Sequence, residues 1–212
     1  MIPGRLAALW AALRGRPPVE RVAHASLPTE YGDFAIHIFE SRLDGDTHVA
    51  LVCGDLGDGR DVLARVHSSC VTGDIFHSSR CDCGQQLEMA MRRVAAEGRG
   101  VVLYLHQEGR GIGLANKIRA YALQEQGHDT VEANEQLGFR ADQRDYASAV
   151  GIFQWLGVKS VRLMSNNPRK LAGVTGTDLS VTLVPIEVEP SDANRRYLKT
   201  KKDKLGHRLS SV

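Results

Sequence analysis

The chain has 212 residues, of which 42% are hydrophobic and 25% are charged. These are ordinary values for a globular protein, and they exclude a disordered or fibrous chain. Lysine and arginine number 27 against 25 aspartate and glutamate residues, which gives a net charge of +2. That charge excludes a general nucleic-acid binder, so an anionic ligand would have to meet a local cluster of donors. No apolar run approaches the length of a membrane span.

The first 20 residues are predicted to form an extension outside the main domain. Residues 6–13 are apolar, but Arg14 and Arg16 follow them, and Pro17-Pro18 stands where a signal peptide would have a small-residue cleavage site. The pattern favours a short amphipathic helix or a poorly ordered segment. We therefore expect a cytoplasmic protein with reduced thiols.

Residues 21–67 have the pattern of β-strands. Segment 33–40 alternates between two sets of side chains, and segments 47–53 and 62–67 are rich in Val, Leu and Ala. Gly and Asp punctuate the gaps between these segments. The pattern predicts an antiparallel or mixed β layer.

From residue 84 onward the spacing of apolar residues changes to the spacing typical of helices. Apolar residues at helical spacing predict three helices, over residues 85–97, 113–126 and 145–156. Short apolar runs predict three further strands, over residues 101–105, 160–164 and 181–188, and the basic tail from Ser191 is predicted to be helical. The fold class is therefore α+β (mixed α/β), with helices covering a sheet. Two long stretches without a period, 68–84 and 127–143, interrupt it, and such loops are often functional.

The strongest chemical signal is the group of Cys70, Cys81 and Cys83. Ten residues separate the first two cysteines, and one residue separates the last two. Three thiolates suit zinc, with the fourth position left for water in a catalytic site. One alternative is a closed structural site with His77 as fourth ligand, and another is that these cysteines are buried apolar groups. Cys53 lies in an apolar run and is expected to pack in the core.

A glycine-rich segment, Gln-Glu-Gly-Arg-Gly-Ile-Gly over residues 107–113, connects a predicted strand to a predicted helix. Its glycines let backbone amides approach a phosphate at the helix start, and Arg110 adds a charged fork. The spacing matches neither a P-loop nor a dinucleotide fingerprint, so a tight strand-to-helix turn is an equal alternative.

Later segments allow both structural and functional interpretations. Asp142 and Arg144 precede a helix, where they are most simply a cap and a solvated charge. Residues 166–170, Asn-Asn-Pro-Arg-Lys, form either a turn before a basic helix start or a phosphate anchor. Tyr121 lies on an apolar stripe and is by default a core residue. Five histidines have no partner in the sequence and are expected at the surface or in the core: His24, His37, His48, His128 and His207.

Taken together, these segments resemble GTP cyclohydrolase II. The motifs that carry the resemblance are residues 65–68, 73–74, 80–84, 107–110, 116–121, 129–134, 137–139, 142–145 and 166–168. The resemblance implies a single catalytic domain over residues 21–209, and we expect the monofunctional form of the enzyme. One departure is Ser69, which stands where many relatives have glutamate.

The resemblance assigns roles residue by residue. It implies an open zinc site held by Cys70, Cys81 and Cys83, a proton acceptor at Asp142, and a tyrosine at Tyr121 that assists ring opening. Arg144 matches an arginine proposed to attack the α-phosphate, although a guanidinium that stays protonated is better suited to stabilising charge. The matching GTP-binding residues are Arg65, Val66, His67, Ser68, Ser69, Gln86, Glu108, Gly109, Arg110, Thr130, Ser165 and Lys170.

The implied reaction is the zinc-dependent hydrolysis of GTP to 2,5-diamino-6-(5-phospho-ribosylamino)pyrimidin-4(3H)-one, formate and diphosphate. This is the first committed step of riboflavin biosynthesis, and Mg²⁺ is expected with the triphosphate. A homodimer is expected, with no nucleic-acid or membrane partner. The alternatives are the same fold in a secondary-metabolite pathway, a reaction that stops at the formamide intermediate, and a non-catalytic zinc-stabilised nucleotide-binding module.

Overall fold

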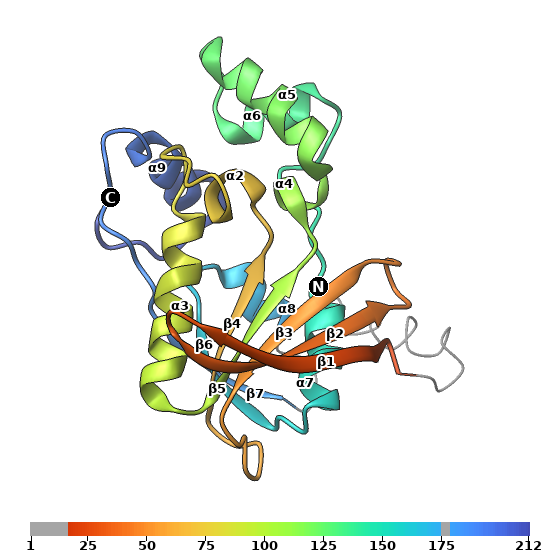
Figure 1. Cartoon of the computed structure of the whole chain (residues 1–212). Coiled ribbons are helices and arrows are strands. Elements are labelled where there is room, and N and C mark those ends of the chain that lie inside the picture. The colour runs from red at the N-terminus through yellow and green to blue at the C-terminus, as the bar shows by residue number, and fades with distance from the viewer. Residues whose placement is uncertain (1–16, 175–178) are drawn as a thin grey trace.

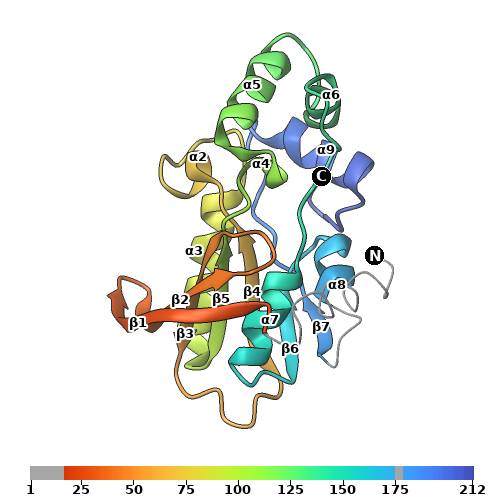
Figure 2. The same cartoon turned by 90° about the vertical axis from the view of Figure 1, so that its right-hand side faces the viewer.

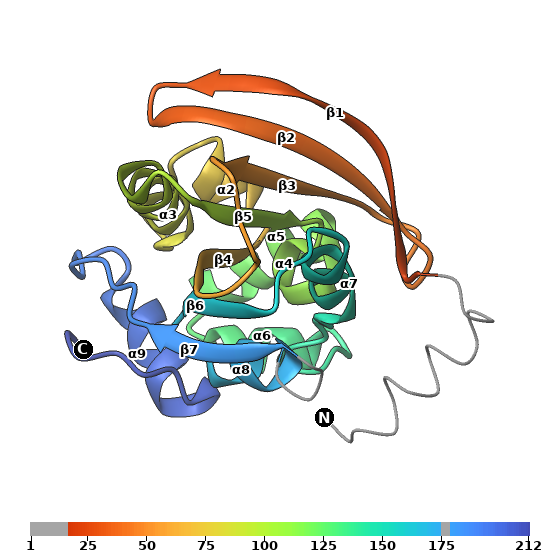
Figure 3. The same ribbon diagram turned by 90° about the horizontal axis from the view of Figure 1, so that it is seen from below.

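A seven-stranded mixed sheet forms the centre of the protein in the computed structural model, which describes residues 17–174 and 179–212. The strands lie in the order β1-β2-β3-β5-β4-β6-β7, as Figure 3 shows from below. Their bounds are β1 Val19–Thr29, β2 Gly32–Ser41, β3 Thr47–Cys53, β4 Val62–Ser68, β5 Gly100–Leu105, β6 Ser160–Met164 and β7 Ser180–Val184.

The sheet has an antiparallel part and a parallel part. Strands β1, β2 and β3 form an antiparallel meander, and β3 pairs with β5 in the same way. Strands β5, β4, β6 and β7 then run parallel to one another. Because β4 is central and covered on both faces, its residues are buried from Val62 to His67. The mixed β layer predicted from the sequence is confirmed, and so is the fold class.

Two helices cover opposite faces of the parallel part (Figures 1 and 3). Helix α3 packs Ala90, Met91 and Val94 on one face, together with strand residues such as Leu63. Helix α7 packs Ala149, Ile152 and Phe153 on the other face. Cys53 is buried in the α3 cluster, as expected. The bounds are α3 Cys83–Glu97 and α7 Ala147–Trp155, and a third helix, α8 Pro168–Val174, follows β6.

The remaining helices lie beyond the carboxyl ends of the parallel strands (Figures 1 and 2). They are α2 Val71–Asp74, α4 Glu108–Gly111, α5 Gly113–Glu125, α6 Thr130–Gln136 and α9 Arg195–Leu205. Helix α6 begins with a capping box, in which Asp129 accepts hydrogen bonds from the amides of Val131 and Glu132. None of the helices in the described part of the chain has both the length and the apolar character that a bilayer crossing needs.

The predicted elements occur with small shifts at their ends. The stretches 68–84 and 127–143, predicted to lack a period, contain the short helices α2 and α6. The last strand was predicted to reach residue 188 but ends at Val184, because the N–H and C=O of Ile186, the next residue that faces β6, bond the side chain of Asn166 instead. Strand β1 starts at Val19, inside the predicted extension, and the helix or poorly ordered segment predicted for residues 1–16 lies outside the described residues.

Candidate active site

The predicted site residues gather at the carboxyl edge of the parallel strands. Cys70 follows β4, Glu108 follows β5, and Ser165 follows β6. Parallel strands end at the same edge of a sheet, and ligands of open α/β sheets bind outside that edge. Three motifs far apart in the sequence are therefore brought to one place by the sheet itself.

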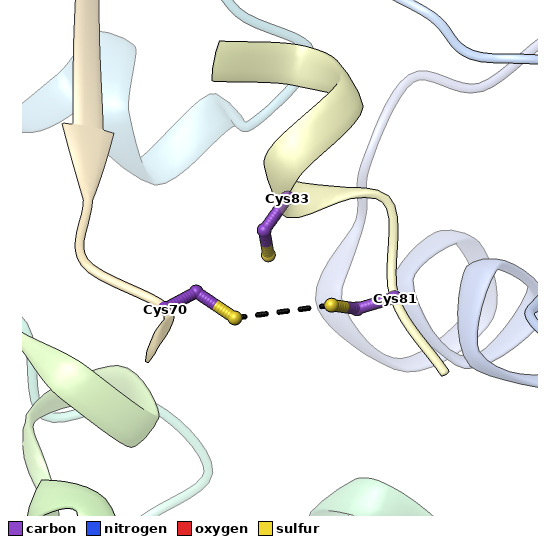
Figure 4. Close-up of side chains that lie close together, drawn as sticks. All are labelled: Cys70, Cys81 and Cys83. Atoms are coloured by element: carbon purple, nitrogen blue, oxygen red, sulfur yellow. Dashed lines mark hydrogen bonds between the residues drawn. The ribbon is translucent and has the colours of Figure 1, made fainter. Parts of the chain in front are cut away.

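The three cysteines form one cluster (Figure 4). Their Sγ atoms all lie within 4.8 Å of one another, and those of Cys70 and Cys81 are 3.8 Å apart. For Zn–S bonds of about 2.3 Å, a tetrahedral site places its sulfurs about 3.8 Å apart, so the cluster fits zinc. His77 is exposed and is not in this cluster, so in the described part of the chain the metal-ligand group has three protein ligands. The cluster therefore does not have the closed Cys₃His arrangement.

A buried lysine and a buried glutamate stand beside the thiols. Lys117 Nζ lies 3.0 Å from Cys70 Sγ and donates to Glu108 Oε1 at 2.8 Å. Hydrogen bonds from Cys81 and Cys83, together with the Lys117 ammonium, hold the pKa of the Cys70 thiol far below its ordinary value. The Cys70 thiolate in turn raises the pKa of Cys81 to about 11. The protein alone thus stabilises one thiolate, and a bound metal would deprotonate the other two.

Asp74 fixes the loop that carries Cys70. Its carboxylate accepts hydrogen bonds from the backbone amide of Cys70 at 2.9 Å, from His67 Nε2 at 3.0 Å and from the hydroxyl of Tyr104 at 3.0 Å. Burial lowers the pKa of His67, which keeps its imidazole neutral with the proton on the nitrogen facing Asp74. This hydrogen-bond network therefore holds Cys70, the first of the three candidate zinc ligands, in position before any metal binds.

Positive charge is buried at the other end of the site. Burial lowers the pKa of Lys170 well below its ordinary value, and repulsion by Arg65 and Arg144 adds to the effect. Lys170 Nζ donates to the carbonyl of Val66 at 2.6 Å, and in the described ranges it forms no ion pair. Arg110 adopts a left-handed backbone conformation with φ of 62°, and its Nη1 is buried without a partner among the described residues. Such groups are suited to an anionic ligand.

Asp142 and Arg144 form a two-pronged ion pair. Arg144 Nε donates to Asp142 Oδ1 at 2.9 Å, and its Nη2 donates to Oδ2 at 2.7 Å. Burial tends to raise the pKa of Asp142, but the guanidinium outweighs it and holds the pKa below its ordinary value. Arg144 is buried, not solvated as its position in the sequence suggested, and it also donates to Ser68 Oγ at 3.4 Å.

One cavity connects the cysteines to the buried cations. It holds about 1120 Å³ of atom-free space, part of which is open to solvent. All of the predicted site residues line it except Val66 and Asp142. Val66 packs in the core, and Asp142 lies behind Arg144. Tyr121, by default a core residue, faces the cavity instead, and its hydroxyl lies 3.3 Å from Thr72 Oγ1 beside the cysteines.

The sequence comparisons agree with this geometry. The sequence profile of GTP cyclohydrolase II matches residues 20–184. A GTP cyclohydrolase-2 from Pseudomonas syringae pv. tomato is 57% identical over 195 residues, which are 92% of this chain and 95% of that protein. The chain belongs to the GTP cyclohydrolase II family.

Other relatives are longer proteins. The riboflavin biosynthesis protein RibBA from Endomicrobium trichonymphae is 54% identical over 92% of this chain, but only 48% of that protein is covered. RibBA from Bacillus subtilis is also 54% identical, over 90% of this chain and 48% of its own length. The chain thus spans about half the length of these RibBA relatives and nearly all of the GTP cyclohydrolase-2.

The GTP cyclohydrolase II cavity also contains residues that sequence reasoning missed. Lys117 belongs to one of the motifs that carry the resemblance, and it lies one helical turn before Tyr121. This spacing places both side chains on one face of the helix, and it could have identified Lys117 as a site residue. Tyr197, Lys201 and His207 come from the C-terminal segment, which was interpreted only as a basic tail. His207 is therefore a cavity residue rather than an unassigned surface or core histidine. Nothing local in the sequence indicates that this segment returns to the site.

Gly73 provides a test of the metal cluster. A Cβ atom at this position would lie 2.8 Å from Cys81 Sγ and 3.2 Å from Cys70 Sγ. We expect Gly73→Ala to lose most of its zinc while keeping its secondary structure, measured by zinc content per chain and circular dichroism. Gly98→Ala is the control: it strains a left-handed backbone position at the end of α3, but nothing lies within 4 Å of the added atom, so it should keep zinc. A fully loaded Gly73→Ala protein would place the metal elsewhere.

The buried His207 should make the stability of the protein depend on pH. Burial, followed by the charges of Lys201 and Arg144, lowers its pKa from 6.5 to about 3. The unfolded chain therefore binds a proton between these values that the folded protein does not, so stability falls as pH drops below 6.5. When the pH falls from 6.5 to 5.5, the free energy of unfolding should drop in both proteins, but by about 1 kcal/mol less in His207→Gln than in the wild type.

Urea titrations at both pH values measure this difference. His77→Gln, which replaces an exposed histidine of the same loop region as the cysteines, is the control and should follow the wild type. Equal pH dependence of the wild type and His207→Gln would contradict the buried neutral state of this imidazole.

Proposed function

We propose that this chain hydrolyses GTP to the diaminopyrimidinone nucleotide, formate and diphosphate. The observation that carries the proposal is a single cavity with three convergent thiols at one end and unpaired buried cations at the other. A nucleoside triphosphate has matching ends, because its base is a neutral ring and its phosphates are anions. The names of the relatives support the same substrate and a role in riboflavin biosynthesis.

The cysteine end is where the guanine ring would open. When bound by the three cysteines, zinc would act as a Lewis acid that activates water for attack on the imidazole part of guanine. Lys117 and Glu108 hold the sulfur of Cys70 in place, since the ammonium contacts both. Tyr121 places a hydroxyl beside the same group, and burial raises its pKa, so the hydroxyl stays protonated at neutral pH and can donate a hydrogen bond to the substrate.

The cationic end would hold the triphosphate. Arg110 and Lys170 have no carboxylate partner among the described residues, so both are free to bind phosphate oxygens, with Mg²⁺ expected alongside. A bound anion would favour the charged form of Lys170 against the burial that lowers its pKa. Ser69, which replaces the more usual glutamate, accepts a hydrogen bond from the backbone amide of Gln107 at 3.1 Å. In this chain Ser69 thus supports the loop of residues 107–110 rather than supplying a carboxylate.

Arg144 acts in this proposal by stabilising charge. Burial works against its charged form, but Tyr146 and Asp142 hold the pKa of its guanidinium above the ordinary value, so it stays protonated. A protonated guanidinium is a poor nucleophile and a good partner for a phosphoryl oxygen. Asp142 can accept a proton only if Arg144 moves away from the Asp142 carboxylate. A bound phosphate would give Arg144 another partner.

Three expectations stay predictions. These are the homodimer, which light scattering at assay concentration tests, the cytoplasmic location, and completion of the reaction beyond the formamide. Mass analysis of the product from GTP separates the complete reaction from one that stops at the formamide. A non-catalytic nucleotide-binding module would bind GTP and release neither formate nor diphosphate.

The first test removes one zinc ligand. Cys81→Ser should lose most of its zinc and all measurable formate release, because a neutral hydroxyl is a poor ligand for zinc. Cys53→Ser, which changes a cysteine in the core of the sheet, controls for general thiol loss and should keep its zinc. Full formate release by a zinc-free Cys81→Ser protein would overturn the proposed reaction.

The second test separates the two ends of the nucleotide. If Arg144 stabilises charge, Arg144→Ala should slow diphosphate release roughly a hundred- to a thousandfold, the scale of one lost transition-state donor. Arg144→Lys keeps the charge without the planar fork and should recover part of the rate. Formate and diphosphate are measured separately for each variant. Complete loss of diphosphate release in both variants would favour a nucleophilic arginine, and undiminished release would remove Arg144 from the site.

A further inference from the structure

The C-terminal segment forms part of the cavity wall although it lies beyond the residues that the family profile covers. The profile match ends at residue 184, whereas Tyr197 and Lys201 on α9, and His207 after it, line the cavity. Among these residues Lys201 makes the most direct contact with the metal-binding loop. Its side chain is 10% exposed, and its Nζ donates to Asp82 Oδ1 at 2.7 Å.

Asp82 stands between two of the zinc-ligand candidates, Cys81 and Cys83. It also occupies the N-cap position of α3, where an aspartate usually accepts hydrogen bonds from the first amides of the helix. Here the side chain makes no such bond. Its carboxylate instead contacts Lys201 through Oδ1 and Gln86 through Oδ2 at 2.6 Å. The ion pair with Lys201 therefore takes the place of the cap and sets the direction of this carboxylate.

The contacts continue from Asp82 into the nucleotide end of the cavity. Gln86, whose Nε2 donates to Asp82, accepts a hydrogen bond from Arg65 Nη2 at 2.6 Å through its Oε1. Arg65 Nη1 donates to the carbonyl of Met164 at 2.8 Å, at the end of β6. A continuous series of buried and partly buried contacts thus runs from α9 through the cysteine loop and α3 to β4 and β6.

Helix α9 keeps its place by contacts that do not involve the Lys201 amine. Leu198 and Leu205 are buried, and Lys204 pairs with Asp129 at the start of α6. After the helix, the amide of Arg208 donates to the carbonyl of Asn166 at 2.9 Å. Removing the ammonium of Lys201 should therefore leave the helix docked and change only the group that it contacts.

We propose that Lys201 is a positioning residue of this active site. Through Asp82 it fixes the Cys81–Cys83 loop for the metal and the Gln86–Arg65 pair for the nucleotide. The inference rests on the proposed function, because it concerns zinc and GTP at that same site. Its effect is on binding at both ends, since Lys201 contacts Asp82, which lies between two zinc-ligand candidates and contacts Gln86, rather than the reacting atoms.

The test replaces Lys201 by methionine, which keeps the length of the side chain and removes the charge. We expect zinc affinity, measured by competition with a chromophoric chelator, to fall about 10- to 100-fold, the scale of lost support to a metal ligand. The KM for GTP should rise about tenfold, the scale of one weakened charged hydrogen bond. Lys199→Met, an exposed lysine on the same helix, is the matched control and should match the wild type in both measurements.

A double-mutant cycle with Asp82→Asn tests whether Lys201 acts through Asp82. If it does, the double variant should bind zinc no more weakly than the weaker single variant, because both changes break the same contact. Lys201→Arg keeps the charge and should restore part of the zinc affinity. The proposal would be overturned if the losses of zinc affinity in the two single variants multiplied in the double variant. It would also be overturned if Lys201→Met kept the zinc affinity and the KM of the wild type.

Two further measurements keep the outcomes separate. Circular dichroism and thermal melting show whether Lys201→Met folds, and Lys201→Gln, which retains a donor, replaces it if it does not. A merely structural role would lower the melting temperature and leave zinc affinity and KM unchanged. The zinc competition does not require turnover, so it still tests Lys201 if the wild-type protein fails to release formate from GTP and the proposed function is wrong.

Discussion

The burial of positive charge at one edge of the sheet is the constraint on which the site depends. Arg65, Arg144, Lys170 and Lys201 are all largely buried at this edge, and each buried ion costs several kcal/mol unless it is paired. Asp142 and Asp82 offset the charges of Arg144 and Lys201. Lys170 has only a carbonyl to contact among the described residues, and its pKa is lowered accordingly. At this edge Arg65 and Lys170 have no carboxylate partner among the described residues, so an anionic ligand would complete the balance there.

The sheet explains why this charge and the cysteines meet at all. The carboxyl ends of β4, β5 and β6 lie at one edge because these strands are parallel. Helices α3 and α7 cover the two faces, so only the edge is left for a ligand. The short helices α2 and α4, which follow β4 and β5, lie above this edge (Figure 2), and residues 108–110 of α4 line the cavity.

Local patterns in the sequence predicted most of the fold and the metal ligands, and they failed where distant segments meet. The spacing of Cys81 and Cys83 indicated a metal site, because both ligands come from one short loop. Arg144 was expected to be solvated because local pattern does not reveal that Ser68, 76 residues earlier in the chain, lies against it. Lys201 was missed for the same reason, since its partner Asp82 is 119 residues away. The helix over Thr130–Gln136 is a different case: Asp129 and Glu132 have capping-box spacing, but no long apolar stripe follows them.

Strand β4 supplies side chains to the site from both faces of the sheet, because its side chains alternate. Leu63 packs against the α3 face, whereas Val62, Ala64 and Val66 pack against the α7 face. Arg65 continues the first set and contacts Gln86 on α3, and Ser68 continues the second and contacts Arg144. A shift of one residue in the register of β4 would exchange these sets and bury the polar groups in the wrong core. The Arg-Val-His-Ser motif is contiguous in the sequence because one pleated strand supplies side chains to the site from both of its faces.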